Sequence, residues 1–511
     1  MINTLYEIVE YQAEIAPEKT AVIFQNKKIN YNTLNEKSNQ IAASLIKLKL
    51  NPGEKTAILL KNSPDYIYSY FGILKTGAAA VPLNTFLKAE ELKYILNDCQ
   101  AKIIITMGCF TEELEKIIAK LPHLKSVILL EESAKYLSLR NIYSDCPKTN
   151  PDIKRNKNDT AIIIYTSGTT GCPKGAMLSH NNLLSNVKSI LEAIKTYNSD
   201  RVLDILPMFH SFTLTVCILV PLYRGITIVI IESIKPFSNV IKNIIKHRAT
   251  IIVCIPNLYQ ILSQAKIPGF LLFFNPVRLC VSGGAPLPPA VLERFEKKFK
   301  IPLLEGYGLS EASPVVSIMP ENKPRKPGSI GAAIPGVDVK IVNENCEELP
   351  AGEIGELIVR GPNIMKGYLN QPEETNKTIK DNWLFSGDLA KMDNENYIYI
   401  VDRKKDMILC HGINVYPREI EDMLYKHPKI AECAVVGIKN KHYKEISKAF
   451  IVLKEGQTAS INEFQTFCKD KLADYKIPHH FEFMQNLPKT PTGKILKRTL
   501  RNQAKEGNST L

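Results

Sequence analysis

The stretch YTSGTTGCPKG, at Tyr165–Gly175, combines hydroxyl side chains, glycines and a lysine directly after the apolar segment AIII. Glycines allow backbone N–H groups to turn toward an anion. Hydroxyl groups add donors, and a lysine ammonium places a positive charge beside a phosphate. The pattern therefore predicts a cradle for the polyphosphate of a nucleotide, built from Thr166, Ser167, Gly168, Thr169, Thr170, Gly171 and Lys174.

Two other interpretations of this stretch have to be compared with the cradle. The Walker pattern G-x-x-x-x-G-K-[ST] does not fit, because Lys174 is preceded by Pro173 and followed by Gly175, which disfavours a P-loop kinase or ATPase. A Gly/Ser/Thr cluster between a strand and a helix can also be an ordinary loop. On this segment alone, that second alternative stays open.

The stretch resembles the signature of the adenylate-forming superfamily, which comprises acyl-CoA ligases, luciferases and nonribosomal adenylation domains. Further segments resemble motifs of the same family, in order and over nearly the whole chain: PMFH at Pro207–His210, SGGAPL at Ser282–Leu287, EGYGLSE at Glu305–Glu311, GEIGELIVRGPNIMKGYLNQPEET, NWLFSGDLA, DRKKDMILCHGINVYPREIE and PKTPTGKILKR. The resemblance implies that a carboxylic acid reacts with ATP to give acyl-AMP and pyrophosphate, and that a thiol then accepts the acyl group.

The resemblance also implies catalytic roles in that first reaction. Ser310 is expected to supply a hydroxyl to the phosphates, and Glu311 a carboxylate to Mg²⁺, which binds few carboxylates together with phosphate oxygens. Family members often have Thr at the position of Ser310, and the hydroxyl is kept. Lys494 is expected to bridge the substrate carboxylate and the α-phosphate. The alternative is that Lys494 is one of several solvated lysines on a basic terminal helix.

The nucleoside part of ATP is expected to contact three of the motifs. The resemblance implies an adenine site, with the ring of Tyr307 as a stacking face, and Asp388 as acceptor for the ribose hydroxyls, with a further contact from Arg403. In isolation, the S-G-D sequence around Asp388 is typical of a turn. The expected adenine site consists of Gly283, Gly284, Glu305, Gly306 and Tyr307.

The segment DRKKDMILCHGINVYPREIE resembles the family's hinge and thiolation face. Asp402 to Lys405 are expected to pivot a C-terminal domain, and Gly412 to let the pantetheine arm of CoA pass close to the backbone. Gly412-x-Asn414 could equally be an ordinary turn. Leu409 stands where aryl-specific relatives have a lysine. With leucine at this position, the motif is similar to that of the long-chain fatty acyl-CoA ligases.

The substrate is the least determined part of this interpretation. His210 corresponds to a family position near the substrate carboxylate, and a buried structural histidine is the alternative. We expect ligation of a medium- or long-chain fatty acid to CoA. An aromatic acid, a carrier protein as acceptor, and a nonenzymatic nucleotide-binding relative are the alternatives. The joint presence of Lys174, Glu311, Asp388 and Lys494 argues against the last of these.

The elements that must position these residues follow from the hydrophobic pattern. Up to about Pro320, short β-branched runs alternate with helical patterns, which predicts an α/β domain of doubly wound parallel sheets. The residues from Pro335 to Val401 predict antiparallel strands in a small barrel-like unit. Residues 402–511 predict a mobile α+β domain, so an AMP-binding domain of residues 1–401 precedes the hinge at 402–405. The predicted strands of the first part are TAILL, KIIIT, SVILL, AIIIYT, TIIVCI and RLCVS.

Composition excludes several other classes of protein. A length of 511 residues calls for at least two domains, and 45% hydrophobic with 23% charged residues is typical of a globular chain. Eleven cysteines without C-x-x-C spacing predict free thiols in a reducing cytoplasm and no metal cluster. The N-terminus is acidic where a secretory signal would be basic, and no apolar run is long enough to span a membrane.

The charge balance bears on partners. The formal charge of +13 suits ATP and CoA, or an anionic membrane surface. Nucleic acid is disfavoured as a partner, because the basic residues are scattered and no nucleic-acid-binding motif is present. A cytoplasmic protein is expected, while peripheral membrane association and a homodimer stay open.

Overall fold

The computed structural model describes residues 2–166, 173–232, 238–265, 275–410, 413–440, 444–469, 471–489 and 495–507. The chain forms two compact units. The first comprises Met1–Arg325, Gly331–Asp338 and Val359–Leu384, and the second comprises Lys326–Ile330, Val339–Ile358 and Phe385–Leu511. The chain therefore passes between the two units more than once. The expected hinge at 402–405, with one domain on either side, stays a prediction.

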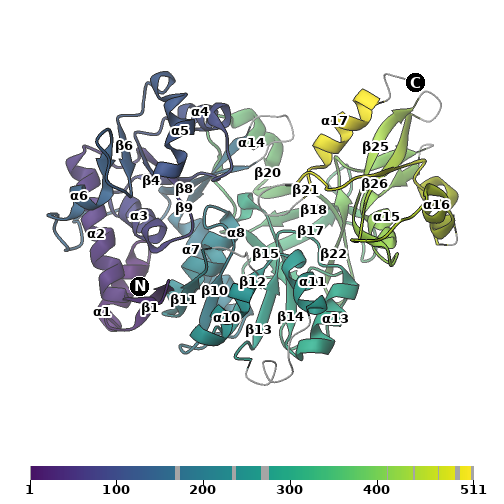
Figure 1. Ribbon diagram of the computed structural model, residues 1–511, viewed down its shortest axis with the longest axis horizontal. Coiled ribbons are helices and arrows are strands. Elements are labelled where there is room, and N and C mark those ends of the chain that lie inside the picture. The colour runs from purple at the N-terminus through teal and green to yellow at the C-terminus, as the bar shows by residue number, and fades with distance from the viewer. Residues whose placement is uncertain are drawn as a thin grey trace. The chain divides into compact units, whose positions relative to one another are not determined.

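A nine-stranded sheet forms the larger half of the first unit (Figure 1), in the order β16-β15-β14-β13-β12-β10-β11-β1-β2. Its six central strands pair in parallel, and their buried, β-branched sequences are typical of strands covered by helices on both faces. The strands are β1 Thr20–Phe24, β2 Lys27–Asn30, β10 Arg201–Asp204, β11 Thr227–Ile230, β12 Ile251–Cys254, β13 Leu279–Ser282, β14 Leu303–Gly308, β15 Val315–Ile318 and β16 Ala332–Ala333.

An eight-stranded sheet forms the other half of this unit, in the order β19-β9-β8-β4-β3-β5-β6-β7. Strands β8 to β7 of this order pair in parallel, while β9 pairs antiparallel with β8 and β19 antiparallel with β9. The strands are β3 Lys55–Leu59, β4 Ala79–Pro82, β5 Ile103–Thr106, β6 Ser126–Leu129, β7 Leu137–Ser138, β8 Thr160–Thr166, β9 Lys174–Ser179 and β19 Gly367–Tyr368.

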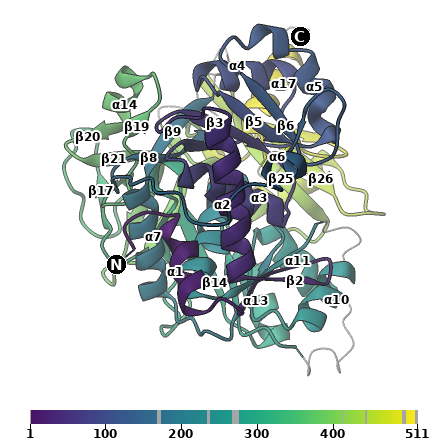
Figure 2. The same ribbon diagram turned by 90° about the vertical axis from the view of Figure 1, so that its left-hand side faces the viewer.

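The helices of this unit begin at residues that favour helix starts. The side chain of Asn30 accepts a hydrogen bond from the Thr33 N–H at the start of α2, and Ser63 with Pro64 begins α3. Figure 2 shows α2 in front of α3. The helices are α1 Glu7–Ile15, α2 Tyr31–Lys47, α3 Pro64–Lys75, α4 Ala89–Asp98, α5 Thr111–Glu115, α6 Leu139–Tyr143, α7 His180–Ala193, α8 Ser211–Thr213, α9 Val220–Arg224, α10 Ser238–His247, α11 Pro256–Gln264, α13 Pro289–Phe299 and α14 Pro372–Thr378.

The second unit contains the C-terminal α+β sheet, in the order β24-β23-β26-β25 with β27 beside β26. Alternate residues of β25 face opposite sides: Cys433 and Val435 join the core with α15 and α16, while Ala434 and Val436 join the core with α17. The elements are β23 Ile408–Cys410, β24 Ile413–Val415, α15 Pro417–Leu424, β25 Ile430–Asn440, β26 Lys444–Leu453, α16 Ile461–Lys469, β27 His480–Phe483 and α17 Lys497–Gly507.

A small five-stranded sheet contains the strands at which the chain passes between the units, in the order β17-β18-β21-β20, with β22 beside β21. Strand β21 pairs antiparallel with both β20 and β22. The strands are β17 Asp338–Val342, β18 Gly355–Arg360, β20 Ile379–Lys380, β21 Trp383–Met392 and β22 Ile398–Arg403.

The expected fold class is confirmed, with a large α/β part in the first unit and a smaller α+β part toward the C-terminus. All six predicted strands are present. The basic terminal helix was expected from Lys494, whereas in the described residues α17 starts at Lys497. Lys494 itself lies outside the described residues.

Candidate active site

The predicted phosphate cradle connects two paired strands. Thr166 is the last residue of β8 and pairs with Lys174, the first residue of β9, so the connection between them has fixed ends. A Cβ atom at Gly175 would lie 2.9 Å from Ile163 and 3.0 Å from the ring of Tyr165, so a larger residue would have to displace one of these side chains. The other predicted members of the cradle lie outside the described residues: Ser167, Gly168, Thr169, Thr170 and Gly171.

Lys174 is a buried cation with a carboxylate partner. The residue is 9% exposed, and its Nζ lies 2.5 Å from Oε2 of Glu374 on α14. The ammonium also lies 5.3 Å from the ring centroid of Tyr368 on β19, within range of a cation–π interaction. The hydrogen bond from Lys174, followed by that from Lys377, lowers the pKa of Glu374 to about 2, so its carboxylate stays ionised. Sequence reasoning missed Glu374 and Tyr368, although both belong to the motif GYLNQPEET.

The YGLSE motif begins in the last two residues of strand β14 and is held from two sides. The carboxylate oxygen Oε1 of Glu311 accepts a hydrogen bond from the Tyr368 hydroxyl at 2.9 Å, and its carbonyl accepts one from the Met365 N–H at 2.8 Å. Burial, followed by the charge of Glu311, raises the pKa of Tyr368, so the phenol stays protonated and donates. The hydroxyls of Ser310 and Ser211 lie 3.0 Å apart.

The PMFH motif follows β10 and ends at a helix start. Nδ1 of His210 accepts a hydrogen bond from the Phe212 N–H at 3.2 Å and so caps α8. In a neutral ring this places the proton on Nε2. The adjoining Ser211 is 2% exposed and faces Ser310, which brings the PMFH and YGLSE motifs into contact.

The SGGAPL motif follows β13 and depends on its glycines. A Cβ atom at Gly283 would lie 2.8 Å from the ring of Phe212, and Gly284 has a φ of +78°, which favours glycine. Glu305 on β14 is 4% exposed, and its carboxylate accepts a hydrogen bond from the Leu287 N–H at 2.9 Å. That bond ties the motif to the neighbouring strand.

Three of the motifs therefore start at the carboxyl ends of parallel strands in one sheet. Strands β10, β12, β13 and β14 are neighbours, and their carboxyl ends meet at the same edge, where ligands bind in open α/β sheets. Gly306 and Tyr307 extend this edge, because β14 continues there as the partner of β15. The predicted residues of the PMFH, SGGAPL and YGLSE motifs are thus brought to one edge of the sheet by topology.

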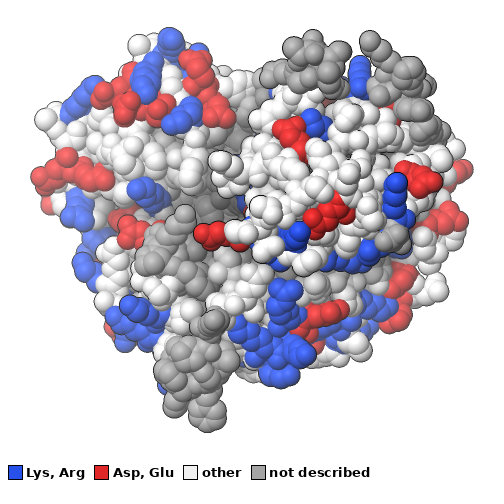
Figure 3. Space-filling view, turned by 45° about the vertical axis from the view of Figure 1, so that its right-hand side comes forward, with Lys and Arg blue, Asp and Glu red and all other residues white. Residues whose placement is uncertain are grey.

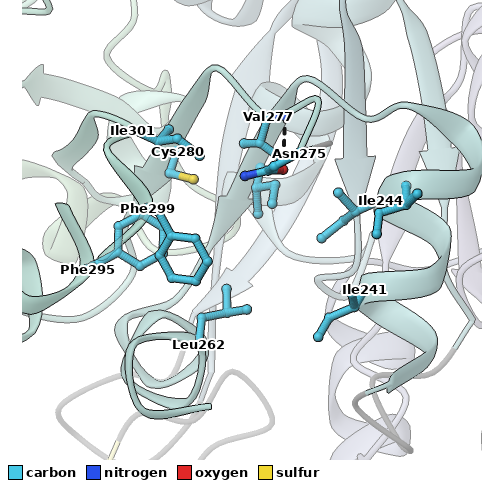
Figure 4. Close-up of a pocket in the computed structure, with 11 residues that line it drawn as sticks. Ile241, Ile244, Leu262, Asn275, Val277, Cys280, Phe295, Phe299 and Ile301 are labelled. Atoms are coloured by element: carbon cyan, nitrogen blue, oxygen red, sulfur yellow. Dashed lines mark hydrogen bonds between the residues drawn. The ribbon is translucent and has the colours of Figure 1, made fainter. Parts of the chain in front are cut away.

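An apolar pocket lies at the opposite ends of these strands (Figure 4), where Val277 precedes β13 and Ile301 precedes β14. Ile241 and Ile244 of α10 line one side of it, and Phe295 and Phe299 of α13 the other. Space not filled by atoms amounts to about 480 Å³, including its open mouth. Phe212 packs against the hydrophobic cluster that supplies most of this lining. The remaining lining residues are Ile245, Ile252, Leu262, Asn275, Val277, Cys280 and Ile301.

The second unit contains the predicted ribose acceptor. Asp388 on β21 is 4% exposed, and its Oδ1 lies 3.0 Å from Nε of Arg403, its cross-strand partner on β22. Asp402 accepts hydrogen bonds from the N–H groups of Arg403, at 2.7 Å, and Arg418, at 2.8 Å, so it ties β22 to the start of α15. Lys405 is exposed.

The remaining predicted residues of this unit fall on or beside gaps in the description. Asn414 lies on β24 and pairs with Leu409, while Gly412 lies outside the described residues. The segment that contains Lys494 is bounded by an antiparallel bridge between Lys489 and Ile495. Lys489 also forms an ion pair with Glu432, which fixes one end of that segment.

The side chains present fit a magnesium ion that is held mainly by the phosphate oxygens of a bound nucleotide. Among the described residues, no group of three or more His, Cys, Asp or Glu side chains could enclose a metal. A single carboxylate such as Glu311, together with phosphate oxygens, is the arrangement in which Mg²⁺ usually binds nucleotides. The ten cysteines of the described ranges are all free thiols.

Figure 3 shows basic and acidic side chains interspersed over the visible face. Within the described residues, no helix has the length and apolar character needed to cross a membrane.

Comparison with known proteins gives the family. Residues 9–369 match the family described as AMP-binding enzyme, and residues 419–494 match the AMP-binding enzyme C-terminal domain. The chain belongs to the AMP-binding enzymes. This AMP-binding enzyme is 36% identical to a long-chain-fatty-acid–CoA ligase of Bacillus subtilis (strain 168), with 99% of this chain and 95% of the relative covered. It is thus an acid–thiol ligase of the adenylate-forming type.

Other similar proteins act on different acids. A feruloyl-CoA synthase of Amycolatopsis sp is 34% identical, with 96% of this chain and 97% of the relative covered. The crystal structure of the anthranilate CoA ligase AuaEII in complex with anthranoyl-AMP superimposes with a TM-score of 0.92 at 30% identity, with 99% of this chain and 98% of that chain covered. The comparisons therefore establish the family and leave the acid open.

Proposed function

We propose that this AMP-binding enzyme activates a medium- or long-chain fatty acid with ATP and transfers the acyl group to CoA. The observation that carries the proposal is the 36% identity, over 99% of this chain, to a protein named long-chain-fatty-acid–CoA ligase. An aromatic acid is the second candidate, because some of the similar proteins are named for such acids.

The first reaction joins two anions. The acid's carboxylate oxygen attacks the α-phosphorus of ATP, the bond from that phosphorus to the β-phosphate oxygen breaks, and pyrophosphate leaves. Lys174 binds the phosphates, and Lys494 bridges the carboxylate and the α-phosphate, which reduces their repulsion. Bound Mg²⁺, held by Glu311 with phosphate oxygens, would supply further neutralisation of the phosphate charge.

The second reaction transfers the acyl group to a thiol. The CoA sulfur attacks the acyl carbon, the bond from that carbon to the AMP oxygen breaks, and the thiol proton passes to solvent. AMP is a good leaving group, which is why the first reaction is needed. We propose that residues 402–405 provide the hinge between the two reactions, and that Gly412 and Asn414 lie along the pantetheine arm.

The test is a panel of acids of different length and aromaticity, assayed for pyrophosphate release with and without CoA and for the thioester product. Thioester formation is expected to peak at aliphatic chains of medium or long length. A peak at aromatic acids would replace the fatty acid in this proposal. Pyrophosphate release without any thioester would replace CoA as the acceptor.

A further inference from the structure

The two groups assigned to the triphosphate share one neighbour. Lys174 lies with its ammonium over the ring of Tyr368, at 5.3 Å from the centroid, while the Tyr368 hydroxyl donates to Glu311 at 2.9 Å. One aromatic side chain thus contacts the phosphate-binding cation by its face and the predicted metal-binding carboxylate by its edge. The three residues come from strands β9 and β19 and from the segment after β14.

The backbone fixes Tyr368 firmly enough for such a role. Strand β19 pairs antiparallel with β9, with Tyr368 opposite Ala176, two residues after Lys174. The Tyr368 N–H donates to the Thr375 hydroxyl of α14 at 2.9 Å. Tyr368 is 8% exposed, so its ring has little freedom to leave either partner.

The same segment also supplies the counterion of Lys174. Glu374, six residues after Tyr368, holds the ammonium at 2.5 Å and is itself held by Lys377 at 2.7 Å. Lys174 is therefore held between a carboxylate and an aromatic face, both contributed by the short β19–α14 segment, residues 367–378. A buried cation that has no such partners is costly to keep charged.

We propose that Tyr368 and Glu374 are positioning residues for the triphosphate: Tyr368 orients the Glu311 carboxylate toward the metal, and Glu374 with the Tyr368 ring orients Lys174 toward the phosphates. This inference rests on the proposed function. It assigns to the β19–α14 segment the task of keeping the two charged groups at a fixed separation before ATP arrives. Preorganised charges need no rearrangement when the ligand binds, which is the main benefit of such a device.

The test measures nucleotide binding without any reaction. ATP binding is followed by calorimetry with no acid and no CoA present, in parallel with Mg²⁺ and with EDTA. Tyr368→Phe keeps the ring and removes the hydroxyl, so the factor by which Mg²⁺ strengthens ATP binding is expected to fall about tenfold to a hundredfold, the range for losing a hydrogen bond to a charged group. Its affinity in EDTA is expected to match that of the wild type.

Glu374→Gln is expected to change ATP binding in the opposite way, in EDTA and not in its response to Mg²⁺. It removes the charge that holds Lys174 and leaves Glu311 untouched, so the affinity in EDTA is expected to fall while the Mg²⁺ factor is unchanged. Matched controls are Tyr136→Phe and Glu115→Gln, which break an exposed hydrogen bond between tyrosine and glutamate in the same unit. Both controls are expected to behave as the wild type.

The outcomes separate this inference from the proposed function. Wild-type protein that binds no ATP would contradict the proposed function itself. If the wild type binds ATP and Tyr368→Phe keeps the full Mg²⁺ factor, Tyr368 does not position Glu311. Tighter ATP binding by Glu374→Gln in EDTA would mean that Glu374 competes with phosphate, and would overturn its positioning role.

Discussion

Two ion pairs, one in each unit, are built in opposite ways. In the first unit, the cation is the shielded member, because the Lys174 side chain is 11% exposed and that of its partner Glu374 is 29% exposed. In the second unit, the anion is shielded, because the side chain of Asp388 is 5% exposed and that of Arg403 is 42% exposed. The comparison teaches that each unit buries the charge its proposed ligand requires: a cation for phosphates, an acceptor for ribose hydroxyls.

The partner in each pair then has a supporting function. An exposed charge contributes little on its own, because water screens it. It does keep the buried charge ionised and in one position. If this interpretation is right, replacing the buried member should affect ATP use far more than replacing the exposed member.

The largest expected effect comes from the buried cation. Lys174→Met is expected to lower acyl-AMP formation about 100-fold, the order that follows the loss of one donor to a developing negative charge. The measurement is acid-dependent pyrophosphate release at saturating ATP. Lys135→Met is the matched control, since it removes an exposed lysine that also pairs with a glutamate. Equal rates in both variants would remove Lys174 from the phosphate site.

A smaller effect is expected from the buried anion. Asp388→Asn keeps the shape of the side chain and weakens it as an acceptor, so the KM for ATP is expected to rise about tenfold, the equivalent of about 1.4 kcal/mol. Steady-state kinetics over a range of ATP concentrations measures this. Arg403→Gln is expected to change the KM about twofold.

The control for this pair is Asp338→Asn, which breaks a similar pair with Arg360 that is exposed on both sides. A larger effect from Arg403→Gln than from Asp388→Asn would reverse the assignment of roles within the pair. The contrast between buried and exposed members would then not hold in the second unit.

The smallest effect on activity is expected for Asp204, a buried carboxyl group without a counterion. Asp204 is 0% exposed, and neither of its carboxylate oxygens has a hydrogen-bond partner among the described residues. Burial raises its pKa well above the ordinary value. Asp204→Leu is therefore expected to raise the free energy of unfolding by about 2 kcal/mol at pH 7, with little change in activity.

The stability gained in Asp204→Leu is expected to depend on pH. The pKa of Asp204 is raised in the folded state. The free-energy cost that its ionisation adds to folding is therefore absent where the carboxyl is protonated in both the folded and the unfolded state. That cost grows as the pH rises above the unfolded pKa of about 4. The advantage of Asp204→Leu should thus shrink as the pH falls from 7 toward 4. Urea unfolding at several pH values measures this, and a variant less stable than the wild type at pH 7 would contradict it.

Much of the fold could be predicted from the sequence, because buried parallel strands have an unmistakable pattern. Segments such as TIIVCI and RLCVS are continuous apolar runs and form β12 and β13. Strand β4, by contrast, has the sequence AAVP, too short and too rich in alanine to stand out. Its place in the sheet depends on pairing with β3 and β8, which is a long-range property.

The candidate site could be predicted only in part, for a related reason. Lys174 stands in a motif whose composition indicates phosphate chemistry, and Glu311 in a motif whose role the family resemblance implies. Glu374 is 200 positions from its partner Lys174, and nothing local in PEET indicates an ion pair. Ser211 likewise meets Ser310 only because β10 and β14 end at one edge of the sheet. Contacts of this kind come from topology.

The central claim is that this AMP-binding enzyme joins a carboxylic acid to AMP with release of pyrophosphate. Acid-dependent exchange of radiolabelled pyrophosphate into ATP, measured with Mg²⁺ over a broad panel of acids, tests it most directly. The account predicts exchange that requires an acid, is strongest with an aliphatic one, and is lost in Lys494→Ala but kept in Arg498→Ala, an exposed basic residue of α17. Absence of exchange with every acid, or undiminished exchange in Lys494→Ala, would contradict it.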